Sequence, residues 1–161
     1  MAQTPFLIDF DALDLSEPVA GRQDVERYLP QRGRFSMLDG ILHEDAERKL
    51  VVGFKEIRED DWWAPDHIPG RPLFPGALMI ETAAQLSAYD YMKFRCDLPE
   101  GSFVGFGGLE GARFRAPVVP PCRFLVATFA SRPRRTMFRY EAQGFVGRQL
   151  VFEGLVIGVV V

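Results

Sequence analysis

Residues 77–94, ALMIETAAQLSAYDYMKF, are the segment that most constrains the fold of this chain. Apolar residues occupy every side of the helix that this segment predicts, and a helix that is apolar all round is buried rather than half-exposed. The segment therefore predicts one dominant helix inside the molecule. With 161 residues, the chain is long enough to form one domain with a substantial core around such a helix.

Strand-forming runs precede and follow this helix. One run covers residues 40–55, and the others, after Gly101, read FVGFGGL, GARFRAPVV, CRFLVATFAS, TMFRYEAQGFV and QLVFEGLVIGVVV. Short turns at 131–135 and 146–149 separate the last three. Strands that are joined by short turns pair antiparallel, because parallel strands need long crossovers. We therefore predict an α+β protein with the hotdog fold, in which a curled antiparallel sheet wraps around one central buried helix.

The segments before the helix have weaker patterns. Residues 1–22 show no clear period and are predicted to form an N-terminal arm, so that the single domain covers residues 23–161. Residues 24–31 predict one or two helical turns that begin at Asp24 as N-cap. Residues 59–76 contain too many prolines and glycines for any regular element and are predicted to form an ordered loop.

Composition and charge exclude several classes of function. The net charge of -3 gives no sign of a general affinity for nucleic acid. Cys96 and Cys122 have neither disulfide nor metal-ligand spacing, which fits a reducing cytosol. The N-terminus does not resemble a signal peptide, and the longest apolar run, 77–86, is too short to span a bilayer. We expect a cytoplasmic protein that binds no metal, nucleic acid or membrane.

The stretch HIPGRPLFPGALMIETAAQ, residues 67–85, places a histidine and a carboxylate around a rigid loop. The prolines and glycines restrict the loop to few conformations, which fixes His67 in place. Glu81 lies in the otherwise apolar helix, and an unpaired carboxylate there costs several kcal/mol. Gln85 is four residues further on and shares the same helix face.

The helix begins at Pro75 and Gly76, where unpaired backbone N–H groups favour negative charge. Together with His67 and Glu81, this helix start supplies a base, an acid and oxyanion donors, which proton abstraction next to a carbonyl requires. The spacing alone leaves two simpler interpretations open. The histidine can be an ordinary turn residue, and the glutamate can be the partner of an arginine.

The same stretch resembles the signature of the β-hydroxyacyl-[acyl-carrier-protein] dehydratases of fatty acid synthesis, His-x-x-Gly-x-Pro-x-x-Pro-Gly-x-x-x-x-Glu. Two flanking blocks, residues 29–42 and 103–120, resemble that family in order and spacing. Asp66 replaces the glycine that the family usually has before the histidine, and Gln31 replaces a histidine of the first block. The fixed positions of the signature fall on His67, Gly70, Pro72, Pro75, Gly76 and Glu81.

The resemblance implies a hotdog homodimer, with a trimer of dimers as a further possibility, and active sites at the dimer interface. In each site, His67 of one subunit would remove the proton α to the thioester, and the Gly76 N–H would stabilise the thioester oxygen. Glu81 of the other subunit would protonate the departing β-hydroxyl. Gln85 would orient Glu81, or it would be a simple polar residue on the helix surface. No cofactor is implied, because the substrate arrives on the phosphopantetheine of acyl carrier protein.

Other residues are weaker candidates for contact with the substrate or the carrier. An acyl tunnel would use Phe74 beside Pro75, with Leu78, Met79 and Phe106, although all of these also suit core packing. Arg132, Arg134 and Arg135 would dock an acidic carrier protein, or would be solvated hairpin residues. Two other functions remain open: hydrolysis of acyl thioesters, and non-catalytic binding of acyl groups.

Overall fold

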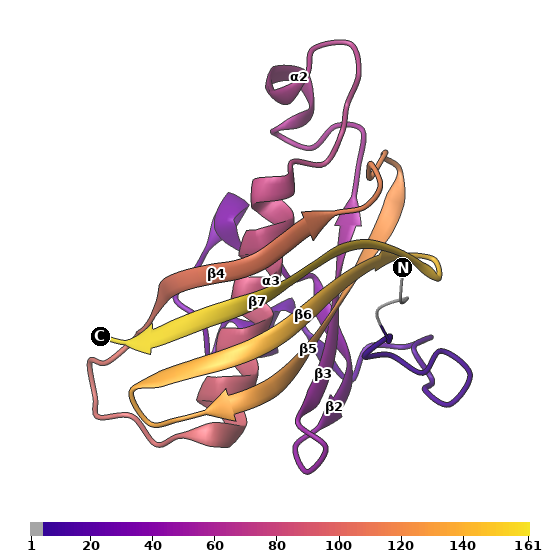
Figure 1. Cartoon of the computed structure of the whole chain (residues 1–161). Coiled ribbons are helices and arrows are strands. Elements are labelled where there is room, and N and C mark those ends of the chain that lie inside the picture. The colour runs from indigo at the N-terminus through magenta and orange to yellow at the C-terminus, as the bar shows by residue number, and fades with distance from the viewer. Residues whose placement is uncertain (1–4) are drawn as a thin grey trace.

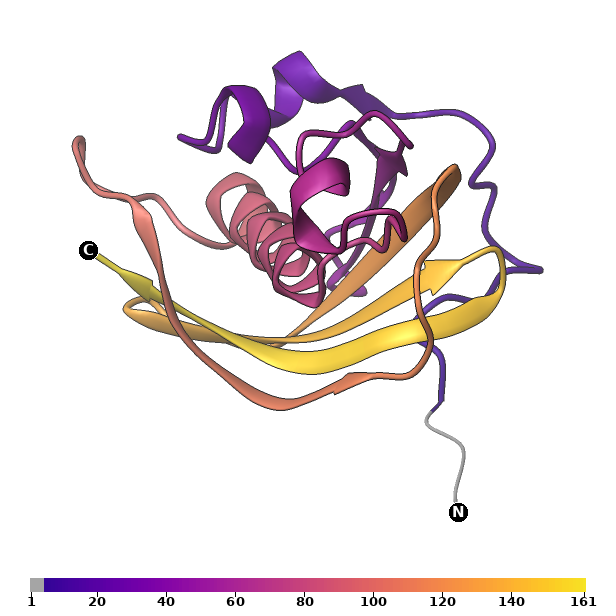
Figure 2. The same cartoon turned by 90° about the horizontal axis from the view of Figure 1, so that it is seen from above.

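The computed structural model describes residues 5–161, which form a seven-stranded sheet curled around one long helix, α3 (Figures 1 and 2). All strand pairs are antiparallel, and the order across the sheet is β1-β2-β3-β5-β6-β7-β4. The predicted hotdog architecture is confirmed. The strands are β1 (Ala20–Gly21), β2 (Gly40–Asp45), β3 (Leu50–Ile57), β4 (Val104–Phe114), β5 (Cys122–Pro133), β6 (Met137–Val146) and β7 (Gln149–Val160).

The central helix α3 (Gly76–Asp90) continues into a π-helical turn, η2 (Tyr91–Arg95), so the predicted helix is confirmed almost to the residue. Figure 2 shows α3 in the hollow of the curled sheet. Its buried residues recur with helical spacing, as Met79, Ala83 and Leu86 show. Burial of a side chain such as Leu86 contributes about 1.5–3 kcal/mol, so this face holds the helix against the sheet.

One stripe of α3 is not fully covered. Ala77 is exposed, and Glu81, Ala84 and Ala88 are half-buried, all on one face of the helix. The prediction that α3 is buried on every side is therefore wrong for the single chain. The physical reason is that the sheet covers one side of the helix and leaves the side toward the edge strand β4 incompletely packed.

The loop before α3 contains a short helix, α2 (Ala64–His67), so the prediction of no regular element over residues 59–76 is wrong for these four residues. Pro65 is compatible with the helix because it lies in the first turn, where its missing N–H needs no partner. The rest of the loop has no regular structure, and Gly70 has a φ of 77°, which favours glycine.

Between β1 and β2, the chain forms α1 (Arg22–Val25) and a 3₁₀ turn, η1 (Gly33–Phe35). The N-cap of α1 is Gly21 and not Asp24 as predicted. The Asp24 carboxylate instead accepts a hydrogen bond from the Gly21 N–H at 3.2 Å. An acid in the first turn stabilises a helix start as a cap does, which explains the error of three residues.

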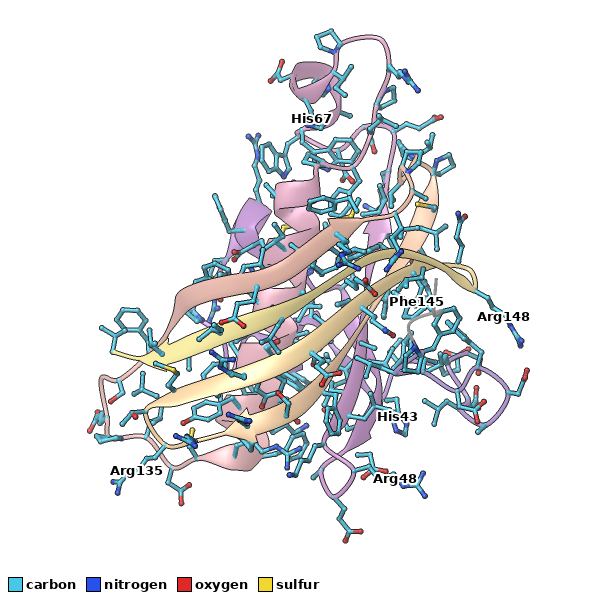
Figure 3. The ribbon with its side chains drawn as sticks, viewed as in Figure 1. His43, Arg48, His67, Arg135, Phe145 and Arg148 are labelled. Carbon is cyan, nitrogen blue, oxygen red and sulfur yellow. The ribbon has the colours of Figure 1, made fainter. Side chains whose placement is uncertain are left out.

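The N-terminal residues from Pro5 onward pack on the outer face of the sheet, opposite α3. The Leu7 N–H donates to Gln143 Oε1 at 2.7 Å, and Gln143 Nε2 donates to the Pro5 carbonyl at 2.9 Å. Phe10 packs edge-on against Phe145, which Figure 3 labels, with ring centroids 5.3 Å apart. Strand β1 lies within residues 1–22, so the last part of the predicted arm joins the sheet, and the boundary at residue 22 stays a prediction.

A buried ion pair fixes the end of α3. Asp90 is 0% exposed, and Arg95 donates to its two carboxylate oxygens at 3.0 and 3.1 Å. The Tyr140 hydroxyl of β6 donates to the same carboxylate. The last residues of the helix are thereby joined to the sheet.

Replacement of Arg95 by methionine is expected to lower the free energy of unfolding by about 3–5 kcal/mol, because Asp90 is left buried without its cation. Urea denaturation measures the change. Arg48→Met is the matched control: the Arg48 side chain is 84% exposed and pairs with Asp45, so its loss is expected to cost less than about 1 kcal/mol. Equal effects of the two substitutions would contradict the role given to the buried pair.

Candidate active site

His67 lies at the end of α2, above the N-terminus of α3 (Figure 3). The side chain is exposed, and its Nδ1 is 2.9 Å from the carbonyl oxygen of Leu73. A carbonyl only accepts hydrogen bonds, so Nδ1 carries the proton of the neutral ring. The lone pair of Nε2 then points away from this contact and is available to accept a proton.

The neighbouring loop is anchored in the core, which holds the Leu73 carbonyl in position. The Phe74 N–H donates to the Val118 carbonyl at 2.9 Å. The Phe74 ring is buried and lies 5.6 Å from the ring centroids of both Trp63 and Phe124. Phe74 therefore supports the loop through core packing, and it also lines a cavity of about 540 Å³ beside His67.

The start of α3 faces the same cavity. Pro75 is the N-cap, and its carbonyl accepts the first helical bonds from Leu78 and Met79 at 2.9 and 3.1 Å. The N–H of Gly76 precedes these bonds and has no acceptor within the helix, as is general for a first turn. A Cβ on Gly76 would lie 2.8 Å from the Phe114 ring, so glycine allows this close approach.

Glu81 is bound by Gln85, one turn further along α3. Gln85 Nε2 donates to Glu81 Oε1 and to the Phe35 carbonyl, each at 2.7 Å. Gln85 Oε1 accepts from the Met37 N–H at 2.9 Å. Gln85 is only 3% exposed, so the interpretation as a surface residue is wrong. Its contacts fix the direction of the Glu81 carboxyl, and the recorded partner of Glu81 is this amide and not an arginine.

A single chain does not bring His67 and Glu81 together. His67 lines the cavity at the start of α3, whereas Glu81 lines a separate cavity of about 50 Å³ between α3 and strands β4 and β7. No hydrogen bond between the two side chains occurs in residues 5–161. Of the tunnel candidates, Met79 lines the first cavity and Phe106 the second.

The arginines predicted to dock a carrier lie on the hairpin between β5 and β6. Arg132, Arg134 and Arg135 are exposed, and Figure 3 shows Arg135 at the end of the molecule opposite His67. The hairpin is anchored by Tyr91, whose hydroxyl donates to the carbonyls of Arg134 and Arg135 at 2.8 Å. Burial raises the pKa of Tyr91 to about 12, so the hydroxyl keeps its proton at neutral pH.

Some of the groups that position the site belong to the backbone and cannot be identified from residue types in the sequence. They are the Leu73 carbonyl at His67, and the Phe35 carbonyl and Met37 N–H at Gln85. Among the described residues, no three His, Cys, Asp or Glu side chains are grouped to hold a metal ion. Within the same residues, no helix combines the length and apolar character needed to cross a membrane.

A curled antiparallel sheet around one helix, with a histidine before the helix and a glutamate within it, defines a protein of the hotdog class. The FabA-like domain model matches residues 29–154. The 3-hydroxyacyl-[acyl-carrier-protein] dehydratase FabZ of Aromatoleum aromaticum is 31% identical over 131 residues, which cover 81% of this chain and 90% of that protein. The chain belongs to the β-hydroxyacyl-[acyl-carrier-protein] dehydratase family.

Solved structures support the fold. The dehydratase heterocomplex ApeI:P from Xenorhabdus doucetiae has a TM-score of 0.69 at 16% identity, over 84% of this chain and 89% of that one. A hypothetical thioesterase with coenzyme A from Streptococcus pneumoniae has a TM-score of 0.60 at 9% identity, over 88% and 97%. Identities this low show the fold alone, and dehydratases and thioesterases share it.

Proposed function

We propose that this chain is a β-hydroxyacyl-[acyl-carrier-protein] dehydratase, which removes water from a β-hydroxyacyl thioester to form a trans-2-enoyl thioester. The observation that carries the proposal is the state of the two motif residues. His67 is held with Nε2 available as a base, and Glu81 is oriented by a fully bonded Gln85. These residues occupy the acid and base positions of a family whose relatives are named dehydratases.

The chemistry follows from these positions. His67 Nε2 removes the proton α to the thioester carbonyl. The Gly76 N–H at the start of α3 stabilises the negative charge that develops on the thioester oxygen. Glu81 gives a proton to the β-hydroxyl through the oxygen that Gln85 does not bind, and the hydroxyl leaves as water. Phe74, which packs in the core, and Pro75, the N-cap of α3, hold the loop and the helix start in position.

We infer that one active site is formed by two chains, with His67 from one subunit and Glu81 from the other. The separate cavities of these residues in one chain support this arrangement. So do three exposed phenylalanines at edge strand β4, beside the uncovered stripe of α3, because exposed apolar patches mark interaction surfaces. Phe103, Phe106 and Phe114 are 50%, 55% and 52% exposed. A trimer of such dimers is a further proposal.

The remaining proposals concern partners and location. The substrate is carried on the phosphopantetheine of acyl carrier protein, the reaction needs no cofactor, and the enzyme works in the cytoplasm. The exposed arginines of the β5–β6 hairpin are a candidate docking surface for the acidic carrier.

Crotonyl thioester offered to the wild-type protein tests the function. Hydration is expected to remove the enoyl absorbance without releasing thiol, because a dehydratase also catalyses the reverse reaction. Release of free thiol would show hydrolysis, the activity suggested by the thioesterase of the same fold. Tight binding of the thioester with neither change would show a non-catalytic acyl-binding protein. Either of these two results overturns the proposal.

A further inference from the structure

Gln31 shares the small cavity that Glu81 lines. This cavity has a volume of about 50 Å³ and lies between α3 and strands β4 and β7. Most of its wall is apolar or glycine, and its polar side chains are Gln31, Glu81 and Gln85. A cavity of roughly 10–15 Å³ already holds a water molecule, so this one accommodates a hydroxyl group or a product water beside Glu81.

The side chain of Gln31 carries an unused acceptor. Its Oε1 is buried and accepts no hydrogen bond from any group in residues 5–161. Gln85, by contrast, has both its amide groups engaged by Phe35, Met37 and Glu81. A buried acceptor without a partner costs free energy, so a ligand hydroxyl or a water that donates to it is bound favourably.

The backbone around Gln31 is fixed, which holds this residue in the wall of the small cavity and of a second cavity of about 250 Å³. The Arg32 guanidinium donates to the Gln31 carbonyl at 2.8 Å and to the Leu29 and Glu26 carbonyls at 2.6 and 2.8 Å. One cation thus ties three carbonyls of the turn between α1 and η1. The backbone that carries the acceptor is held by the fold before any substrate binds.

We propose that Gln31 binds the β-hydroxyl of the substrate and the water formed from it; this inference rests on the proposed dehydration. A hydroxyl group has one hydrogen to donate and lone pairs to accept. Gln31 Oε1 accepts that hydrogen, which turns a lone pair of the hydroxyl oxygen toward the proton of Glu81. When the C–O bond breaks, the oxygen leaves with its own hydrogen and the one from Glu81, and Gln31 still accepts from the resulting water.

Binding measurements in the His67→Ala protein test this role without turnover. Gln31→Met, which keeps the length of the side chain but removes the acceptor, is expected to weaken binding of a 3-hydroxyacyl thioester about tenfold. Binding of the matching enoyl thioester, which has no hydroxyl, is expected to stay unchanged. Gln31→His returns an acceptor nitrogen and is expected to recover most of the lost affinity for the hydroxyacyl compound.

Thermal unfolding separates this role from a structural one. Removal of an unpaired buried acceptor is expected to leave the melting temperature of Gln31→Met unchanged or higher, whereas a structural residue would lower it. If both thioesters lose affinity equally, or neither does, the hydroxyl-binding role is wrong even when the wild type dehydrates. If the wild type neither hydrates nor dehydrates, the proposed function fails instead. If Gln31→Met does not fold, the binding of the same two thioesters is compared in Gln31→Leu.

Discussion

Replacement of His67 by alanine is expected to lower kcat/KM for dehydration by about 10²–10⁴-fold, the range that a positioned general base contributes. The stability of the protein is expected to change little, because the side chain is exposed and its recorded hydrogen bond is a single one to the Leu73 carbonyl. Steady-state kinetics with a 3-hydroxyacyl thioester, together with thermal unfolding, measure both quantities.

The chain contains its own control for this experiment, since it has two histidines. His43 lies on strand β2, lines neither cavity of the candidate site and is expected to tolerate alanine with less than about a threefold change in kcat/KM. If His67→Ala retained wild-type activity, or if both substitutions were equally harmful, His67 would not be the base.

Mixing two inactive variants is expected to restore activity if each site takes His67 from one subunit and Glu81 from the other. His67→Ala and Glu81→Gln are each expected to be almost inactive alone. In a heterodimer, His67 of the Glu81→Gln chain meets Glu81 of the His67→Ala chain, and one of the two sites is intact. Random pairing makes half of the dimers mixed, so co-refolded equal amounts are expected to show about a quarter of wild-type activity.

The control for mixing is His67→Ala combined with the double variant His67→Ala/Glu81→Gln. No pairing of those chains contains a histidine at residue 67, so activity is expected to remain at background. A site built within one chain would give no restoration in either mixture, because neither single variant carries both groups. That result would show that the active site is not shared between two subunits, and the separation of His67 and Glu81 within one chain would need another explanation.

Local chemistry explains why much of the fold was predictable. Helix α3 could be predicted because it depends on contacts between residues three or four apart in the sequence. The sequence shows its start at Pro75 and Gly76 and the apolar residues that follow. The strands after Gly101 and their turns were predictable in the same way, because strand side chains alternate with a period of two residues and turns use characteristic residue types. Strand β4 has a register shift between Phe106 and Gly108, where the sequence reads GFGG.

The features that the sequence did not predict have two causes: local bonds that the composition of a loop conceals, and packing that no local pattern records. The four-residue helix α2 belongs to the first kind, because the N–H groups of Asp66 and His67 donate to the carbonyl of its own N-cap, Trp63, in a loop rich in proline and glycine. The half-buried stripe of α3 depends on how far the sheet extends around it. The packing of Phe10 against Phe145 joins segments more than a hundred residues apart.

For this protein, the sequence by itself determined the hotdog class and placed His67, Gly76 and Glu81 on one motif. These features follow from the spacing of residues close together in the sequence, which is known without the folded structure. Only the tertiary structure decided the tautomer of His67, the bonding of Gln85 to residues 48 and 50 positions away, and the unfilled acceptor of Gln31. Hydrogen bonds of that kind depend on where distant backbone groups meet, and folding alone brings them to the same place.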